Sequence, residues 1–178
     1  YACAQLAQGL GFDGIDINMG CPDKSVEKQG AGAALIKNPN HAQEIIKETM
    51  RGAGDLPVSV KTRIGYNHNT IKEWMKYLLD TGLAAITIHG RTRKEMSKVD
   101  ANWEVIAEAV NIARKFDGSE NRTLILGNGD VKDVKDAKEK AKQYGVDGVM
   151  IGRGMFGNPW LWSEIQPSVQ EKLSVMVE

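Results

Sequence analysis

The residues of this sequence best suited to chemistry are a thiol and an amide in the stretch Gly-Ile-Asp-Ile-Asn-Met-Gly-Cys-Pro, residues 14–22. Its two isoleucines predict a short buried strand over residues 14–18, and its last glycine and its proline end that strand in a tight loop. Cys21 lies in this loop, three residues after Asn18. Because ligands of parallel α/β proteins bind where strands give way to loops, Cys21 is a candidate catalytic residue. The alternative is a small buried side chain, which is the commoner role of a free cysteine.

Two further strand ends carry paired cations. Lys61 and Arg63 end an apolar strand predicted over residues 58–63, and their spacing places both on the same side of it. His89 and Arg91 repeat this spacing at the end of the next predicted strand. A buried ammonium without a partner is costly, so these cations indicate an anionic or electron-rich ligand. The alternatives are a lysine that extends to solvent and a structural histidine.

Two glycine-rich loops follow the last two predicted strands. Residues 127–130 read Gly-Asn-Gly-Asp and residues 152–154 read Gly-Arg-Gly, and each loop leads towards a helix. Glycines let backbone N–H groups approach an anion, and a helix N-terminus favours one. A phosphate site commonly follows the last two strands of a (β/α)8 barrel, so these loops predict such a site with Arg153 as its charged clamp. Each glycine pair alone would also fit an ordinary turn.

The elements that must position these residues alternate between strands and helices. Strands are predicted at residues 14–18, 58–63, 84–89, 123–126 and 148–151, and helices at 1–10, 30–36, 40–51, 70–81, 102–115, 131–144 and from 159 onwards. This alternation predicts a parallel sheet, in either an open doubly wound fold or a (β/α)8 TIM barrel. Five strand–helix units cannot close an eight-stranded barrel, and the chain begins with Tyr1, so we expect a partial barrel from a longer chain.

Composition narrows the class of protein further. The 178 residues balance 23 lysines and arginines with 23 aspartates and glutamates, so net charge favours neither nucleic acid nor membrane. No apolar run reaches the length of a membrane span, and Cys3 and Cys21 form neither a disulfide framework nor a metal-ligand spacing. We expect a cytoplasmic protein with no metal and no membrane partner. The basic residues at 90–98 predict either a rim suited to a polyanion such as RNA or an ordinary solvated loop.

Five motifs, in their order and spacing, resemble those of the bacterial tRNA-dihydrouridine synthases. They are NMGCP after the first strand, VKTR, ITIHGRTR, GNGD and MIGRGMFGNPW. The resemblance covers residues 1–165 and implies an FMN-containing (β/α)8 barrel followed by a helical tRNA-binding domain. It also implies reduction of uridine to 5,6-dihydrouridine in tRNA, with NADPH reloading the flavin.

The resemblance further implies a role for each candidate residue. Cys21 would be the general acid that protonates carbon 5 of uracil while the flavin delivers hydride to carbon 6, and its thiol would stay neutral. The cofactor would be held at its ring by Lys61 and His89 and at its phosphate by Asn128, Gly129, Asp130, Gly152 and Arg153. The residues that would face the uracil or the RNA backbone are Asn18, Arg63 and Arg91.

The matched motifs correspond to strands four to eight of that family's barrel. We therefore expect residues 1–165 to form a partial FMN-binding barrel and residues 166–178 to begin a linker to a helical domain. We expect the full enzyme to be a monomer, and residues 1–178 alone to be inactive. Two alternatives stay open: a non-catalytic RNA-binding remnant of the same fold, and another FMN barrel oxidoreductase that acts on a free pyrimidine.

Overall fold

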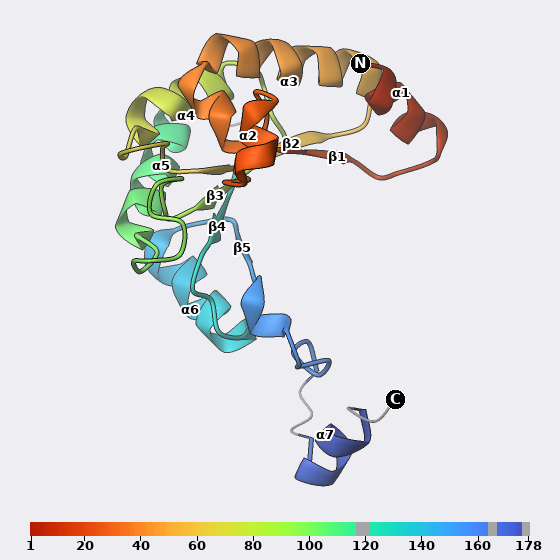
Figure 1. Cartoon of the computed structure of the whole chain (residues 1–178), viewed down its shortest axis with the longest axis vertical. Coiled ribbons are helices and arrows are strands. Elements are labelled where there is room, and N and C mark those ends of the chain that lie inside the picture. The colour runs from red at the N-terminus through yellow and green to blue at the C-terminus, as the bar shows by residue number, and fades with distance from the viewer. Residues whose placement is uncertain (117–121, 164–166, 176–178) are drawn as a thin grey trace.

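The computed structural model describes residues 1–116, 122–163 and 167–175. Their five strands form one sheet: β1 (Ile15–Asn18), β2 (Val58–Arg63), β3 (Ala85–His89), β4 (Leu124–Asn128) and β5 (Gly148–Met150). Each neighbouring pair is parallel, and the strand order in the sheet is the order in the chain (Figure 1). A doubly wound sheet reverses its strand order partway, whereas a barrel adds each strand on the same side. The partial (β/α)8 barrel predicted from the sequence is therefore confirmed, and the open doubly wound sheet is excluded.

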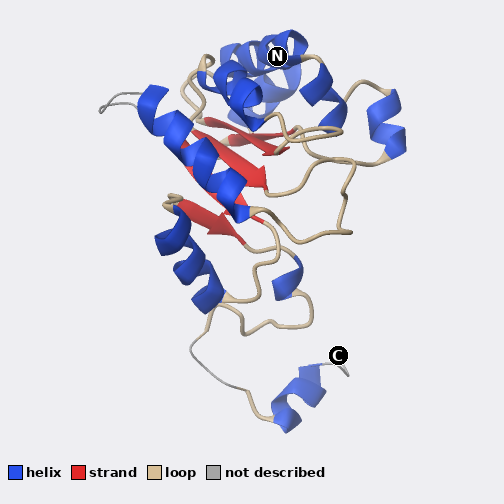
Figure 2. Ribbon diagram, turned by 90° about the vertical axis from the view of Figure 1, so that its left-hand side faces the viewer, coloured by secondary structure: helices blue, strands red, loops and turns tan. Residues whose placement is uncertain are grey.

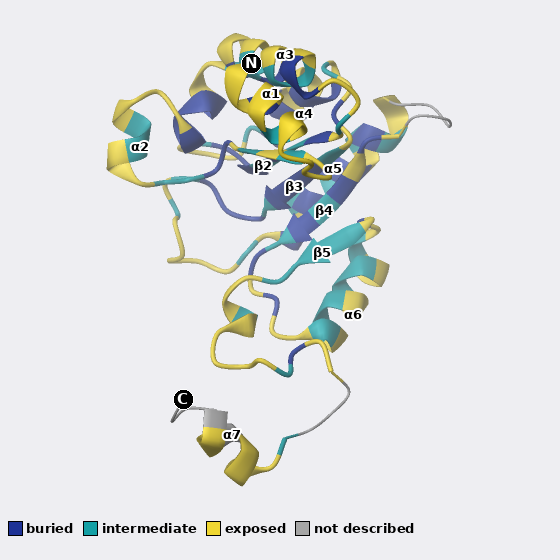
Figure 3. Cartoon of the chain, turned by 90° about the vertical axis from the view of Figure 1, so that its right-hand side faces the viewer, coloured by how far each residue is buried: buried dark blue, intermediate teal, exposed yellow. Residues whose placement is uncertain are grey.

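The sheet is curved, and helices cover its outer, convex face (Figures 1 and 2). The helices of the described residues are α1 (Ala2–Gly9), α2 (Lys24–Lys28), the 3-10 helix η1 (Gly32–Lys37), α3 (Pro39–Ala53), α4 (Ile71–Leu79), α5 (Trp103–Phe116), α6 (Val134–Tyr144), the 3-10 helix η2 (Arg153–Met155) and α7 (Val169–Val175). α3, α4, α5 and α6 each connect two neighbouring strands, as the crossovers of a barrel do. α7 stands away from the sheet, and its described side chains are exposed (Figure 3).

The core lies between the sheet and these crossover helices. Its fully buried side chains include Trp74 of α4, Ile86 of β3 and Ile106 of α5. Nε1 of Trp74 donates to Oγ1 of Thr62 at 3.0 Å, and this hydroxyl donates to the carbonyl of Met19 at 3.2 Å. These two bonds tie α4 to β2 and to the loop after β1. The core thus holds the base of the loop that carries the thiol.

The fourth strand is longer than predicted. β4 runs to Asn128, two residues past the predicted end at residue 126, because Gly127 and Asn128 pair with Val149 and Met150 of β5. Asn128 therefore belongs to the strand and has its position fixed by neighbours on both sides.

The segments around the thiol loop and after β5 also differ from the prediction. Residues 30–36 were predicted to be helical after their glycines, and η1 is a helix there, of the 3-10 type, with the N–H of Ala33 at its start bonded to the carbonyl of Cys21. α2 is an unpredicted helix, capped by Asp23, whose carboxylate accepts the N–H of Ser25. Residues 159–162 form turns instead of the predicted helix. The predicted domain boundary at residue 165 lies outside the described residues.

Two structural absences hold over the described ranges. Every helix there is too short or too polar to cross a lipid bilayer. The same residues contain no group of three or more His, Cys, Asp or Glu side chains placed to hold a metal ion.

At the amino ends of β4 and β5, the Asp147 carboxylate, whose side chain is 12% exposed, accepts hydrogen bonds from three donors. Oδ1 of Asp147 accepts from Nη2 of Arg114 at 3.0 Å and from Arg122, while Oδ2 accepts the N–H of Ile125 at 2.9 Å. Burial would raise the pKa of Asp147, but the hydrogen bonds and the two guanidinium charges outweigh it and hold the pKa below its usual value. The ionised carboxylate therefore stabilises the folded chain.

Asp147→Asn should lower the free energy of unfolding of the full-length protein by about 1–3 kcal/mol near pH 7, because two guanidinium groups lose a charged acceptor. Since the folded pKa is depressed, this stabilisation is complete above the unfolded pKa of about 3.9 and is lost as the pH falls through the folded value. Denaturant unfolding from neutral pH into acid should show the two proteins converging. Asp55→Asn, which alters an exposed carboxylate, is the control. A gap that stays constant into acid would contradict this account.

Candidate active site

The carboxyl ends of the strands meet at one edge of the sheet, where a cavity of about 700 Å³ opens. The register brings the strand ends level: Asn18 pairs with Lys61. His89 pairs with both Arg63 and Asn128. The cavity is lined by Pro22, Lys61, Arg63, His89, Arg91, Met96, Ser97, Asn128, Gly129, Asp130, Val131, Lys132, Gly152, Arg153 and Gly154. Its volume is typical of a ligand or cofactor site.

The structure brings most of the predicted site residues into this lining. Asn18 and Cys21 are the exceptions, although Pro22, the neighbour of Cys21, does line the cavity. Lining residues that were not predicted include Met96, Ser97, Val131 and Lys132. Lys132 could have been found as a further cation just past a glycine-rich strand end. Met96 and Ser97, in the loop after β3, carried no such signal, because only the folded loop returns them to the cavity.

The backbone around Cys21 is held by four hydrogen bonds, and its side chain is partly buried. Oδ1 of Asn18 accepts the N–H groups of Gly20 at 3.0 Å and Cys21 at 3.1 Å. Nε of Arg63 donates to the carbonyl of Gly20 at 2.7 Å. The N–H of Ala33 donates to the carbonyl of Cys21 at 2.9 Å. The thiol is thus presented by a loop whose polar backbone groups already have partners.

Arg63 links this thiol loop to the loop after β3. Its side chain is buried, with the residue 8% exposed, and Nη1 donates to the carbonyls of Thr92 at 3.2 Å and Met96 at 3.4 Å. Its Nε bond to Gly20 completes the bridge. One buried guanidinium therefore sets the spacing of two loops that border the cavity.

Lys61 of β2 reaches across the sheet edge to Asn128 of β4. Nζ of Lys61 donates to Oδ1 of Asn128 at 3.1 Å, and Nδ2 of Asn128 donates to the carbonyl of Met150 at 2.9 Å. Burial lowers the pKa of Lys61, the charge of Arg63 lowers it further, and Asp16 partly offsets both. The ammonium makes this single hydrogen bond among the described residues, so it has two N–H groups to offer a ligand.

Asp130 gathers the charges at the next strand end. Its carboxylate accepts from Nη2 of Arg91 at 2.6 Å, the N–H of Ala101 at 2.8 Å and Nη2 of Arg153 at 3.2 Å. Burial raises the pKa of Asp130, but Arg91 and these other donors lower it below its usual value. Burial, followed by the charges of three nearby cations, lowers the pKa of His89 to about 3, so its imidazole is neutral.

The backbone is unusual at this same edge. Among the described residues, Met96 at φ 57° and Asp130 at φ 51° are the non-glycine residues with positive φ, and both line the cavity. Gly129 has φ 122°, and a Cβ there would lie 2.6 Å from the Cβ of Ala101. Such conformations are costly and persist only where the surroundings enforce them. Residues 128–130 therefore form a rigid turn at the end of β4.

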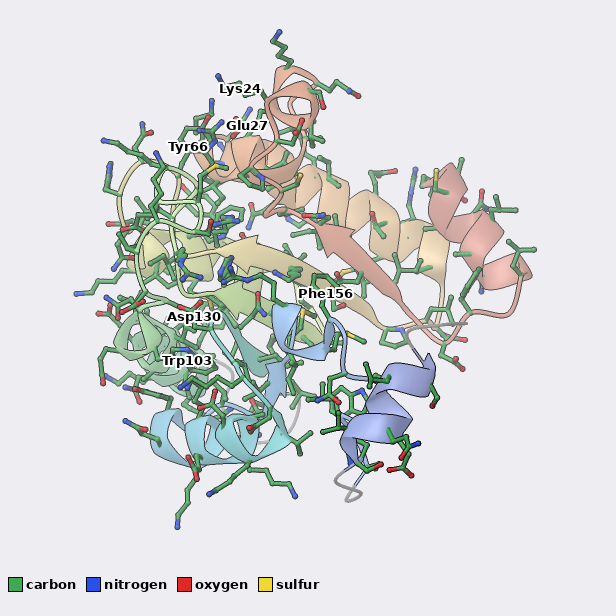
Figure 4. All side chains as sticks on the ribbon, turned by 60° about the horizontal axis from the view of Figure 1, so that its bottom comes forward. Lys24, Glu27, Tyr66, Trp103, Asp130 and Phe156 are labelled. Atoms are coloured by element: carbon green, nitrogen blue, oxygen red, sulfur yellow. The ribbon has the colours of Figure 1, made fainter. Side chains whose placement is uncertain are left out.

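Only some of the basic residues at 90–98 are exposed. Arg91 is buried against Asp130, and Arg93 forms a two-bonded ion pair with Glu27 of α2. Figure 4 shows Glu27 of α2 and Tyr66 near one another, and the Arg93 guanidinium lies 5.5 Å from the centre of the Tyr66 ring. The exposed basic residues of this segment are Lys94 and Lys98. The predicted rim therefore rests on two lysines.

Taken together, these features define a partial (β/α)8 barrel with a cationic, glycine-edged cavity at the carboxyl ends of its strands. The chain belongs to the dihydrouridine synthase family, whose model, described as "Dihydrouridine synthase (Dus)", matches residues 1–177. The resemblance seen in its motifs is thereby confirmed.

Curated relatives from several bacteria are similar in sequence. A "Probable tRNA-dihydrouridine synthase" of Staphylococcus aureus is 52% identical over 161 residues, which cover 90% of this chain and 47% of that protein. A "Probable tRNA-dihydrouridine synthase 2" of Bacillus subtilis is 48% identical over 156 residues, covering 87% of this chain and 46% of that protein. The chain therefore spans about half the length of these relatives.

Solved structures with much lower sequence identity share the fold. A putative phosphonomutase from Burkholderia cenocepacia matches with a TM-score of 0.65 at 15% identity, over 97% of this chain and 79% of that one. Oxaloacetate acetylhydrolase matches with a TM-score of 0.60 at 12% identity, over 92% of this chain and 60% of that one. At these identities the likeness concerns the fold alone.

Proposed function

We propose that the full-length protein is a tRNA-dihydrouridine synthase that uses FMN and NADPH to reduce a uridine of tRNA to 5,6-dihydrouridine. The observation that carries this proposal is the cavity at the strand ends, where Lys61, neutral His89 and two glycine-edged turns converge beside the Cys21 loop. Membership of the dihydrouridine synthase family supplies the reaction. We further propose that the protein acts in the cytoplasm as a monomer, and that residues 1–165 are its FMN-binding part.

The residues present at the cavity fit a flavin mononucleotide. A Cβ built at Gly152 meets nothing within 4 Å, so the backbone there is open to a bulky anion. Arg153 is exposed and pairs with Asp130 at 3.2 Å, an exposed ion pair that is cheap to rearrange. We propose that Asn128, Gly129, Asp130, Gly152 and Arg153 hold the phosphate end. The carboxylate of Asp130 is tolerated there because two guanidinium groups neutralise it.

At the ring end, the free N–H groups of Lys61 and the imidazole of His89 would contact the cofactor. When bound, the flavin supplies the hydride for the double bond of uracil. Lys61 would hold a positive charge beside the ring, in a site where burial strengthens its effect. His89, which is neutral, would add a hydrogen bond without a second charge.

Cys21 is proposed to hold the proton that carbon 5 of uracil receives. A general acid must keep its proton at a defined position, and the four bonds to the backbone around Cys21 fix where Sγ can reach. Asn18 and Arg63 make three of those bonds. We therefore propose that these two residues act on the uracil chiefly by positioning the thiol loop.

The tRNA is proposed to approach over the exposed basic residues of the loop after β3. Lys94 and Lys98 are exposed there and can contact phosphates. Arg91 is 3% exposed and already donates to Asp130, so we propose that it shapes the site and does not contact the RNA backbone.

The purified full-length protein tests the proposal. It should be yellow, release FMN on denaturation, and form dihydrouridine in tRNA that lacks this modification when NADPH is supplied. A colourless protein that binds RNA would favour the non-catalytic alternative. A yellow protein that reduces a free pyrimidine but leaves tRNA unchanged would favour another FMN barrel oxidoreductase.

Arg153→Ala should raise the dissociation constant for FMN about tenfold, because a charge-assisted contact to the phosphate is lost. Fluorescence titration of the flavin-free protein measures this constant. Arg51→Ala is the matched control, since Arg51 is an exposed arginine of α3 that pairs with Glu48 and lies outside the cavity lining. Equal dissociation constants for the Arg153 variant and the wild type would remove Arg153 from the phosphate site.

A further inference from the structure

The two ring nitrogens of His89 have different surroundings. Nε2 lies 3.2 Å from Nη1 of Arg91. A guanidinium carries only donors and stays protonated in proteins, so it must donate and Nε2 must accept. An imidazole that accepts at Nε2 is unprotonated there. If the ring is neutral, its one proton is then on Nδ1.

Arg91 is held so that it cannot turn away from this ring. Nη2 of Arg91 bonds to Oδ2 of Asp130 at 2.6 Å, and Nε bonds to the carbonyl of Val99 at 2.5 Å. The residue is 3% exposed. The same edge of the imidazole packs on Gly129, where an added Cβ would lie 3.0 Å from Cδ2 and 3.3 Å from Nε2 of His89. A rotation that exchanged the two ring edges would therefore lose both the Arg91 bond and this packing.

Nδ1 of His89 faces a different environment. It makes no hydrogen bond within the described residues. Among those residues, the fully buried side-chain nitrogen or oxygen that lacks a partner is Nη1 of Arg114, so Nδ1 of His89 is not fully buried. Nδ1 is therefore accessible, and His89 lines the cavity.

The charges that act on the ring agree with a neutral imidazole. Lys61, Arg63 and Arg91 place positive charge near His89, and Asp130 only partly offsets it. Burial is the larger cause of its low pKa. A second ring proton is therefore disfavoured by both burial and repulsion.

We propose that Arg91, fixed by Asp130, locks His89 in the Nδ1–H tautomer, so that the ring presents one uncharged N–H donor to the cavity. Arg91 and Asp130 are then positioning residues for His89. The ligand atom that this donor recognises is an acceptor, either a carbonyl oxygen or an unprotonated ring nitrogen. That this acceptor belongs to a flavin ring rests on the proposed function, whereas the tautomer does not.

Long-range proton–nitrogen correlation spectra of the nitrogen-15-labelled full-length protein test the proposal, with a His89→Gln spectrum to assign the ring. In the wild type, Nδ1 should resonate as a protonated nitrogen and Nε2 as an unprotonated one, with no change from about pH 6 to pH 8 because the pKa is low. In Arg91→Met, signal from the Nε2–H form should appear and His89 should bind a second proton at a higher pH. The matched control is Arg93→Met, because Arg93 pairs with Glu27 and does not contact His89.

A wild-type spectrum with the proton on Nε2 would overturn the proposal without any variant. So would an Arg91→Met protein that retains the pure Nδ1–H form, or an Arg93→Met protein with the same change as Arg91→Met. If Arg91→Met does not fold, Asp130→Asn weakens the hold on Arg91 and should give a mixture of tautomers. None of these spectra depends on turnover. A protein that forms no dihydrouridine but shows the Nδ1–H ring would therefore contradict the proposed function and still support this inference.

Discussion

Cys21→Ala in the full-length protein is expected to lower dihydrouridine formation about a hundredfold to ten-thousandfold, the usual cost of removing a general acid. FMN content and the rate of flavin reduction by NADPH should stay unchanged. The reason is positional: Cys21 lies beside the cavity and outside its lining, whereas the proposed cofactor contacts lie within it. Single-turnover reduction of tRNA by pre-reduced enzyme separates the two half-reactions.

Two control variants sharpen this test. Cys3→Ala removes an exposed cysteine of α1 and should leave both half-reactions intact. Asn18→Ala should move the thiol without removing it, because the N–H groups of Gly20 and Cys21 lose their shared acceptor. Its rate should fall between those of Cys21→Ala and the wild type. Near-normal dihydrouridine formation by Cys21→Ala would rule out the thiol as the proton donor.

Short-range interactions explain why much of the fold can be predicted from the sequence. β2 occupies residues 58–63 as predicted, because β-branched residues alternate within the strand itself. The start of α4 was predicted to within one residue, and Oδ1 of Asn69, just before it, accepts the N–H of Ile71 at 2.9 Å. The end of β4 was not predicted, because Gly127 and Asn128 are residue types typical of loops. They belong to the strand because they pair with β5, more than twenty residues later in the chain.

The candidate site, like the fold, was predicted from the sequence only in part. That Lys61 and His89 lie at one edge follows from the parallel sheet, so sequence alone brought them together. Their partners were not predictable, because the pairing of Arg91 with Asp130 spans 39 residues of chain and that of Arg93 with Glu27 spans 66. Arg91 and Arg93 were both predicted to face RNA, but these long-range ion pairs bind them to other parts of the chain. A count of basic residues therefore overstates the positive charge that this segment exposes to a polyanion.

The end of β4, which carries Asn128, requires a glycine at position 127, and the neighbouring residues in the sequence do not show why. Gly127 is buried in β4, and a Cβ there would lie 2.3 Å from Cζ3 and 2.6 Å from Cη2 of Trp103. The indole is itself fixed, because Nε1 donates to the carbonyl of Gly129 at 2.9 Å and the residue is 6% exposed. Figure 4 shows Trp103 directly below Asp130 at this edge. A side chain at position 127 must therefore displace the ring that supports the turn at residues 128–130.

Gly127→Ala is accordingly expected to destabilise the full-length protein by about 3 kcal/mol, the upper end of the usual cost of overpacking, and to weaken FMN binding with it. Denaturant unfolding measures the first effect and flavin titration the second. Gly9→Ala is the control: a Cβ there meets nothing within 4 Å, and alanine should stabilise α1 by up to about 0.5–1 kcal/mol. Because the clash is with one ring, the alanine should cost less in a Trp103→Leu background than in the wild type. Strictly additive costs in the double variant would show that the ring is not what excludes a side chain from position 127.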